Sequence, residues 1–212
     1  MTLILGLTGS IGMGKSTAAR LLRAQGVPVF QADQYVHRLL NKGGIAVGAV
    51  ARAFPAAYDK KGQKIDRVRL GRVVFQNPSA RKILEDILHP LVRKAEERFI
   101  RIWRARVVRV AVLDIPLLYE TRADVLCDAV LVVSAPASVQ RARVLARKGM
   151  TPEKLKTIRT AQMSDAQKRA RADAVLNTDQ PLAATNRDLQ KILRALQKTH
   201  ARNHSGYRNH GA

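Results

Sequence analysis

The feature that most constrains this chain is a glycine-rich segment near its N-terminus, which fits the pattern G-x-x-x-x-G-K-[ST]. Gly9, Gly14, Lys15 and Ser16 occupy the fixed positions. Glycines let the backbone turn so that successive N–H groups point at phosphate oxygens. The first turn of a following helix adds N–H donors and the positive end of its dipole. The segment therefore predicts a phosphate-binding loop in which Lys15 reaches the β- and γ-phosphates of a nucleotide and the Ser16 hydroxyl holds Mg²⁺.

The flanking residues supply the strand and the helix that such a loop requires. The apolar run 3–7 is typical of a buried strand, and small and apolar residues recur at helical spacing from Ala18 to Leu22. Gly26 then ends the predicted helix. A glycine-rich turn without a ligand would also fit the pattern, but the strand–loop–helix context favours phosphate binding.

Length and composition indicate one α/β domain with an insertion. The chain has 212 residues, of which 46% are apolar, enough to bury a substantial core. Its single cysteine, Cys127, excludes an internal disulfide and fits a reducing cytoplasm, which is the expected location. The apolar N-terminal stretch lacks a basic leader and runs directly into the loop, so we do not expect a signal peptide.

The chain is strongly basic, with 38 Lys and Arg against 16 Asp and Glu and a net charge of +22. Such an excess is found in proteins that bind nucleic acids and in proteins that bind small polyanions. Aromatic residues make up only 4% and do not interleave with the basic ones, so the sequence lacks a stacking surface for single strands. We therefore expect polyphosphate substrates, no nucleic acid and no membrane partner.

Four further apolar runs are predicted to be short strands, at 27–30, 107–113, 129–133 and 174–176. With the first strand they predict a central five-stranded parallel sheet, where ligands bind at the carboxyl ends of the strands. Asp33 follows the second strand and Asp114 ends the third. A carboxylate at Asp33 would be placed to accept a proton from a substrate hydroxyl, the alternative being a helix N-cap before Gln34. Asp114 suits Mg²⁺ held through water.

The segment between the second and third strands is predicted to be almost entirely helical, and it is longer than a plain crossover needs. The expected breaks are Gly43-Gly44, a loop at 54–65, Asn77-Pro78 and a corner at His89-Pro90. Pro90 suits the first position of a new helix. Such a block indicates a substrate-side insertion, with His89 as a hydrogen-bonding residue at the corner.

Short basic helices are predicted after the fourth strand. The first closes at Gly149, the second begins after Thr151 with Pro152 at its first position, and Ser164 opens a capping box. We interpret these helices as a lid over phosphates, the alternative being a solvated surface. A final helix is expected from Pro181 to about Lys198.

Together these motifs resemble the dephospho-CoA kinase family, from Leu5 to about Leu189. The phosphate loop alone indicates only a nucleotide-binding protein. The other pieces make the resemblance specific because they occur in a fixed order. They are Ala32-Asp33, His89-Pro90, Asp114-Ile115-Pro116-Leu117-Leu118-Tyr119-Glu120, Gln140-Arg141, Ala161-Gln162-Met163 and Ala172-Asp173.

The resemblance implies a P-loop NTPase-type three-layer fold with a helical substrate-binding insertion and a helical lid. The nucleotide-binding core would comprise 1–33, 107–136 and 163–198, the coenzyme-binding domain 34–106, the lid 137–162, and a disordered tail 199–212. The expected oligomeric state is a monomer.

The resemblance also implies an activity, the ATP-dependent phosphorylation of the 3′-hydroxyl of dephospho-CoA ribose, which completes coenzyme A synthesis. Asp33 would accept or orient the attacking hydroxyl, while Lys15 and Arg141 would offset the charge on the transferred group. ATP would be held by Gly12, Met13, Gly14, Lys15, Ser16 and Thr17, with Ser16 on Mg²⁺. Dephospho-CoA would be bound by Thr8, Asp33, His89 and Leu117.

The chain departs from the family at three positions. They are Ser10, where glycine is frequent, Gln31, where aspartate is often found, and Ile158, where many members have arginine. Arg159 lies beside Ile158. Two other classes of function use the same loop. A nucleoside monophosphate kinase would differ in its acceptor, and a nucleic-acid-stimulated ATPase would show a steep salt dependence.

Overall fold

The structure is a computed structural model that describes residues 1–205, except for the side chains of residues 76, 204 and 205. The chain divides into two compact units. Gln31–Phe99 form the smaller unit, and Met1–Phe30 together with the chain from Ile100 onward form the larger one. Each unit has its own cluster of buried apolar residues.

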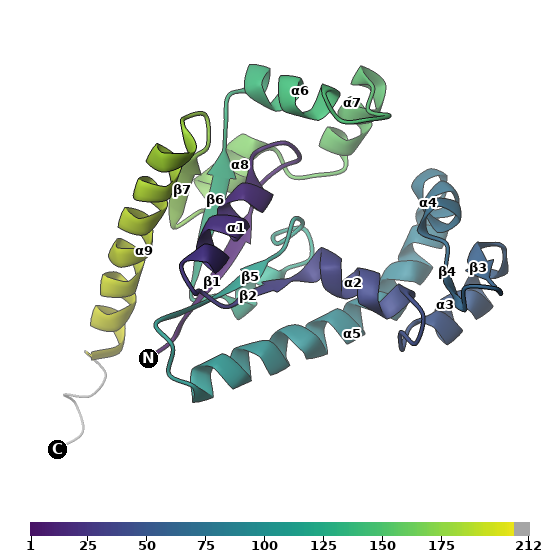
Figure 1. The fold of residues 1–212 in the computed structure, drawn as a ribbon, viewed down its shortest axis with the longest axis horizontal. Helices are drawn as coiled ribbons and strands as arrows, with labels where there is room; N and C mark the ends of the chain where they lie inside the picture. Colours follow the sequence, from purple (N-terminus) through teal and green to yellow (C-terminus); the bar gives the residue numbers. More distant parts are fainter. Residues whose placement is uncertain (206–212) are drawn as a thin grey trace. The chain divides into compact units, whose positions relative to one another are not determined.

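The larger unit is built on a five-stranded parallel sheet with the order β2-β5-β1-β6-β7 (Figure 1). Its strands are β1 (Leu3–Thr8), β2 (Val29–Gln31), β5 (Val110–Asp114), β6 (Ala129–Ser134) and β7 (Ala174–Asn177). Every residue of β1, β5 and β6 is buried, which explains why these strands are continuous apolar runs in the sequence. The predicted α/β fold with a five-stranded parallel sheet is confirmed.

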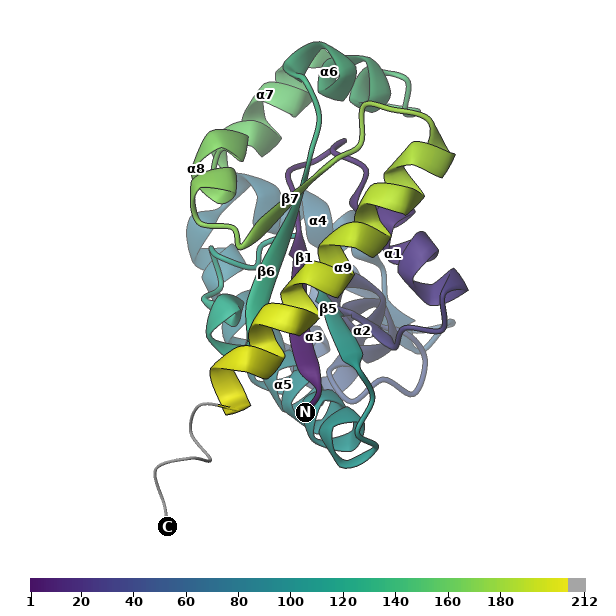
Figure 2. The same cartoon turned by 90° about the vertical axis from the view of Figure 1, so that its left-hand side faces the viewer.

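Two helices of the larger unit, α1 and α9, cover one face of the sheet (Figure 2). Leu22 of α1 and Leu189 of α9 are fully buried in one cluster with Leu5 of β1 and Leu131 of β6. Three shorter helices follow one another near the carboxyl ends of the strands. The helices are α1 (Lys15–Ala24), α6 (Ala137–Leu145), α7 (Pro152–Thr160), α8 (Asp165–Ala170) and α9 (Leu182–Ser205), with a 3₁₀ turn η2 (Ala123–Leu126).

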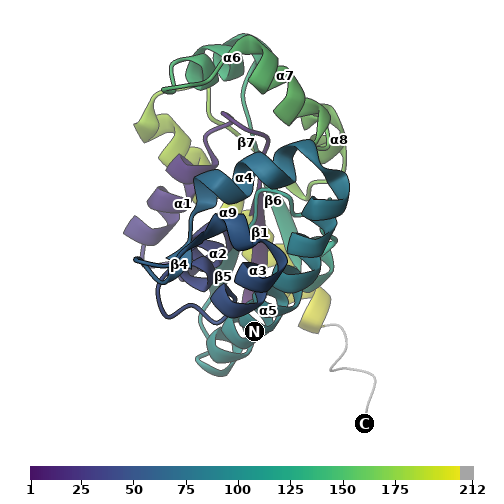
Figure 3. The same ribbon diagram turned by 90° about the vertical axis from the view of Figure 1, so that its right-hand side faces the viewer.

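The smaller unit is mainly helical, as predicted (Figure 3). It holds α2 (Ala32–Leu40), α3 (Val47–Ala53), η1 (Pro55–Ala57), α4 (Arg67–Gln76) and most of α5 (Pro78–Ala105). The prediction of a plain loop at 54–65 is wrong, because this segment also forms a hairpin of β3 (Tyr58–Asp59) and β4 (Lys64–Ile65). Burial of Ile65 in the core of the unit anchors the hairpin.

The predicted corner at His89-Pro90 is also wrong, because α5 runs unbroken through both residues. Proline removes one N–H donor and normally bends or ends a helix. Here the apolar residues Leu84, Leu88 and Leu91 continue at helical spacing on both sides of Pro90, and all three pack in the same core. Their burial favours one continuous helix over two.

The last helix extends beyond its predicted end at about Lys198 and finishes at Ser205. The prediction of disorder from Thr199 is therefore wrong for 199–205, since no glycine or proline interrupts this stretch before residue 206. The rest of the predicted tail, 206–212, lies outside the described residues. Within residues 1–205, no helix combines the length and the apolar character needed to cross a membrane.

A buried carboxylate on α5 predicts a pH-dependent stability. The side chain of Glu96 is only 4% exposed, and burial raises its pKa from 4.5 to about 7, against the opposing effect of Arg93. The folded protein therefore binds this proton more tightly than the unfolded chain. Its contribution to stability is present in full below pH 4.5 and is lost as the pH rises to about 7.

Glu96→Gln is expected to abolish this loss, because the amide has no proton to release. Relative to wild type, the variant should gain roughly 3 kcal/mol of unfolding free energy between pH 4.5 and pH 8. Urea denaturation at both pH values measures the change. The control is the exposed neighbour Glu97→Gln, which removes only the smallest of the three effects on the pKa of Glu96 and should retain most of the loss. An equal response of the two variants to pH would contradict the prediction.

Candidate active site

The phosphate loop lies between the end of β1 at Thr8 and the start of α1 at Lys15, as predicted. Gly12 and Gly14 have φ of 79° and 88°, which favour glycine. Gly9 is required for a different reason, since a Cβ there would lie 2.4 Å from Cγ2 of Val133. The glycines therefore shape the loop and let it approach the neighbouring strand.

A lysine and a carboxylate meet beside this loop. Asp114 ends β5, which pairs with β1, and the register places Asp114 opposite Leu7. Lys15 Nζ lies 2.5 Å from Asp114 Oδ1, and the Asp114 side chain is only 3% exposed. Adjacent parallel strands thus bring together two residues that are 99 positions apart.

The oxygen atoms near the loop suit Mg²⁺. Ser16 is the second residue of α1 and offers a hydroxyl, and Asp114 offers a buried carboxylate. Mg²⁺ usually takes only one or two ligands from the protein and the rest from water and phosphate. Among the residues that the structure describes, no cluster of three or more His, Cys, Asp or Glu side chains could hold a metal ion.

A cleft of about 670 Å³ opens between the loop and the basic helices α6 and α7. Ser10 lies at one side of it, and its buried hydroxyl has no hydrogen-bond partner among the described residues. Arg141, Lys156 and Arg159 also line the cleft, whereas Ile158 is absent from its lining. The arginine beside the family position, and not the isoleucine in it, therefore borders the space.

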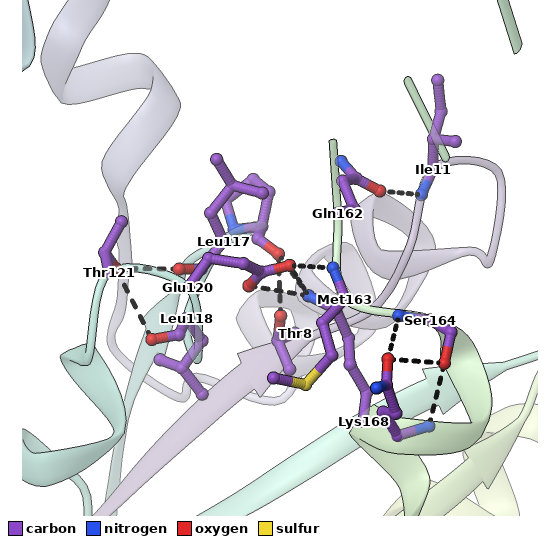
Figure 4. Close-up of polar contacts among 12 residues, drawn as sticks. Thr8, Ile11, Leu117, Leu118, Glu120, Thr121, Gln162, Met163, Ser164 and Lys168 are labelled. Carbon is purple, nitrogen blue, oxygen red and sulfur yellow. Dashed lines mark hydrogen bonds and ion pairs between the residues drawn. The ribbon is translucent and has the colours of Figure 1, made fainter. Parts of the chain in front are cut away.

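Two glutamines bind the loop from opposite ends of this helical segment. Gln140 of α6 donates from Nε2 to the Ile11 carbonyl oxygen at 2.8 Å. Gln162, between α7 and α8, accepts a hydrogen bond from the Ile11 N–H at 3.3 Å (Figure 4). Both glutamines belong to motifs of the family resemblance, but the sequence assigned neither of them a contact.

The segment after Gln162 is held by an ion pair between a buried lysine and a partly exposed glutamate (Figure 4). Glu120 accepts a hydrogen bond from the Met163 N–H at 2.8 Å and lies 3.0 Å from Lys168 Nζ. Lys168 is fully buried, and burial lowers the pKa of its ammonium group, with Glu120 opposing that effect. The sequence did not predict this pair, because its two residues lie far apart in the chain. The capping box predicted at Ser164, just before Lys168, is confirmed.

The opposite side of the loop is braced by the residue that follows β7. The Thr178 hydroxyl donates to the Met13 carbonyl oxygen at 2.8 Å and accepts from Arg143 Nη1 at 3.0 Å. The Met13 sulfur in turn accepts from the Ala135 N–H at 3.2 Å. The sequence missed Thr178, since a single threonine after a strand carries no signal of its own.

The predicted coenzyme-binding residues lie in different environments. Thr8 is fully buried and donates to the Pro116 carbonyl oxygen at 2.9 Å, while Leu117 is 37% exposed. Asp33 and His89 are exposed residues of the smaller unit, whereas Lys15 belongs to the larger one. The roles of these four residues therefore stay predictions.

The alternative role of Asp33 as an N-cap is wrong. Helix α2 begins at Ala32, one residue after β2 ends at Gln31. Gln31 is the N-cap, and no side chain caps the helix. Asp33 is therefore the second helical residue, and its exposed carboxylate has no capping function.

Lys15 lies on a strand–loop–helix unit of a five-stranded parallel sheet, and basic helices lie beyond the carboxyl edge of that sheet. This arrangement defines a P-loop kinase fold. The sequence model of one kinase family, described as dephospho-CoA kinase, matches residues 3–184. The chain belongs to the dephospho-CoA kinase family.

Relatives and solved structures agree with this assignment. The chain is 55% identical to a dephospho-CoA kinase of Paramagnetospirillum magneticum over 166 residues, 78% of this chain and 77% of the relative. It is 46% identical to that of Rhodopseudomonas palustris over 196 residues, 92% and 96% of the two chains. The structure of dephospho-CoA kinase from Campylobacter jejuni matches 94% of this chain and 99% of its own, with a TM-score of 0.72 and 26% identity. The crystal structure of TT1252 from Thermus thermophilus matches 92% of this chain and 98% of its own, with a TM-score of 0.77 and 35% identity.

Proposed function

We propose that Lys15, Asp33 and Arg141 carry out the reaction that membership of this family assigns to the chain, the ATP-dependent phosphorylation of dephospho-CoA at its ribose 3′-hydroxyl. The observation that carries the proposal is the Lys15–Asp114 pair at the mouth of a complete phosphate loop. Asp114 neutralises the lysine and holds it beside the loop. Bound phosphates would then compete with Asp114 for the same ammonium group.

The loop would bind the triphosphate through Gly12–Thr17, whose N–H groups and helix dipole favour anions. Lys15 would stabilise the negative charge that spreads over the γ-phosphoryl group during transfer. Mg²⁺, when bound through Ser16 and Asp114, supplies positive charge to the β- and γ-phosphates. All the residues that we propose to bind and orient ATP therefore belong to the larger unit.

Transfer also needs an acceptor held in line and a base for its proton. A ribose hydroxyl is a poor nucleophile, and a carboxylate that accepts its hydrogen bond orients the oxygen and takes the proton. We assign this role to Asp33, with residues 34–106 receiving the coenzyme. Thr8, His89 and Leu117 are proposed as further contacts to it.

The helices within 137–162 are proposed to act as a lid. Their basic residues border the cleft beside the phosphate loop, where Arg141 would offset charge on the transferred group. A closed lid would exclude water and so limit ATP hydrolysis. The protein is proposed to act as a cytoplasmic monomer that requires no nucleic acid.

The proposed activity is tested by incubating dephospho-CoA with enzyme and MgATP and following both coenzymes by mass spectrometry. Dephospho-CoA should gain one phosphoryl group, with one ADP formed per coenzyme A. Nucleoside monophosphates serve as alternative acceptors. Faster phosphorylation of a nucleoside monophosphate than of dephospho-CoA would refute the proposed substrate.

Arg141→Ala is expected to lower kcat by roughly 10- to 100-fold, because a charge facing the transferred group is lost. Binding to duplex or single-stranded nucleic acid should not change, if the basic lid serves polyphosphates. Steady-state kinetics and a filter-binding assay at several salt concentrations measure both quantities. Arg147→Ala, an exposed arginine outside the cleft lining, is the matched control. Nucleic-acid-stimulated ATP hydrolysis that disappears in Arg141→Ala would contradict the prediction.

A further inference from the structure

The peptide groups on both sides of Ile11 are fixed by side chains from outside the phosphate loop. Gln140 Nε2 donates to the Ile11 carbonyl oxygen, and Gln162 Oε1 accepts from the Ile11 N–H (Figure 4 shows the second bond). The direction of each hydrogen bond is determined, because a backbone N–H only donates and a carbonyl only accepts. Gln140 must therefore present its amide nitrogen and Gln162 its amide oxygen.

The orientation of these peptides is not determined by the loop sequence itself. Gly12 follows Ile11, has φ of 79° and carries no Cβ, so the glycine tolerates either sign of φ and does not by itself select one orientation of the Ile11–Gly12 peptide. That peptide is trans, and in a trans peptide the C=O and the N–H point in opposite directions. Fixing the Ile11 oxygen on α6 therefore directs the Gly12 N–H away from α6.

The packing of the loop on α6 keeps Gln140 in place. A Cβ at Gly12 would lie 2.5 Å from Cγ2 of Val144 and 3.2 Å from the carbonyl oxygen of Gln140. Gln140 itself is only 4% exposed. The amide thus has little freedom to leave the Ile11 carbonyl, and it acts as a fixed donor.

Gln162 is fixed through its neighbour. The next residue, Met163, donates its N–H to Glu120, and Glu120 is paired with the fully buried Lys168. Lys168 also donates to the Pro116 carbonyl oxygen at 3.1 Å. The segment that carries Gln162 is therefore attached to the residues that follow β5.

We propose that Gln140 and Gln162 are positioning residues that lock the two peptides flanking Ile11, so that the Gly12 N–H points toward the β- and γ-phosphates of the nucleotide. The proposal rests on the proposed function of the loop in ATP binding. Without the lock, the loop samples rotated peptides in which one phosphate donor is replaced by a carbonyl oxygen. Apparent affinity for a polyphosphate then falls in proportion to the competent fraction of molecules.

The test compares Gln140→Met, which keeps the length of the side chain but removes the donor, with wild type. ADP affinity, measured by titration calorimetry, should fall about tenfold if the competent fraction falls to about one tenth. AMP has no β-phosphate to reach the locked donor, so its affinity should not change. The KM for ATP should rise by a similar factor while kcat changes less than about twofold, because saturating ATP selects the competent loop.

An isosteric pair of variants tests the direction of the two hydrogen bonds. Gln162→Glu retains an acceptor for the Ile11 N–H, whereas Gln140→Glu presents only acceptors to the Ile11 carbonyl. Both add the same charge, so ADP affinity should be lower in Gln140→Glu than in Gln162→Glu. Gln25→Ala, which loses a surface hydrogen bond to Asn186, is the control and should behave like wild type.

Unchanged ADP affinity in Gln140→Met would overturn the proposal, and so would parallel losses for ADP and AMP, which indicate a purely structural role. Equal ADP affinities in the two glutamate variants would also overturn it. These binding measurements need no acceptor. An absence of dephospho-CoA phosphorylation by wild type would therefore refute the proposed function and leave the positioning role to be judged on ADP binding.

Discussion

Lys15→Ala is expected to lower kcat for dephospho-CoA phosphorylation by at least about 10³-fold. We propose that the lysine stabilises the negative charge of the γ-phosphoryl group in the transition state. Electrostatic stabilisation of this kind is a large part of the catalysis of phosphoryl transfer. Steady-state kinetics with MgATP measures the effect. Near-normal turnover by a correctly folded variant would remove the basis for assigning Lys15 to the phosphates.

A second variant separates chemistry from folding. Lys15→Ala leaves the buried Asp114 carboxylate without its lysine, and breaking such a pair typically costs about 3–5 kcal/mol of stability. Lys15→Ala/Asp114→Asn replaces that charge by a neutral amide and should recover much of the stability. It should not recover turnover. Thermal denaturation and kinetics of both variants distinguish the two effects, and recovery of activity in the double variant would contradict the assignment.

Asp33→Asn is expected to lower the single-turnover rate by at least roughly 10²-fold, the usual scale for loss of a general base. The amide keeps the shape of the carboxylate, so ATP and dephospho-CoA should bind about as tightly as to wild type. Asp33 does not cap α2, and removing its charge from the first turn should cost less than about 1 kcal/mol of stability. An unchanged single-turnover rate would mean that Asp33 is not the base.

Asp66→Asn is the matched control for this experiment. Asp66 is another carboxylate of the smaller unit, and it does cap a helix, accepting from Val68 N–H and Arg69 N–H at the start of α4. Asparagine caps nearly as well as aspartate, so both stability and turnover should stay close to wild type. The comparison distinguishes loss of a base from a general effect of an Asp→Asn change in this unit.

The sequence predicted the sheet and the loop because both depend on local patterns. Buried parallel strands are continuous apolar runs, and the loop needs glycines at Gly9, Gly12 and Gly14 for space or for positive φ. Caps at Thr151 and Ser164 were predicted for the same reason, since capping is settled within four residues. Such features need no knowledge of distant contacts.

The features that sequence analysis missed depend on tertiary packing. Pro90 is a helix breaker locally, whereas the packing of Leu88 and Leu91 in one core favours a continuous α5. The Lys15–Asp114 and Lys168–Glu120 pairs join residues far apart in the chain, so the spacing of residues in the sequence does not predict them. The motifs of the family resemblance identified Gln140 and Gln162 as residues of interest, but only the structure shows that both contact Ile11.

The anchoring of the loop also limits how it can be transplanted. Gly6–Thr17 contains the whole recognisable phosphate motif, yet the carbonyl and N–H groups of Ile11 and the carbonyl of Met13 are held by Gln140, Gln162 and Thr178. A protein engineer who grafts only the motif onto another sheet would transfer its glycines without these supports. A functional graft would have to include the ends of α6 and α7 and the turn after β7, so the smallest portable unit is a three-dimensional cluster and not a linear peptide.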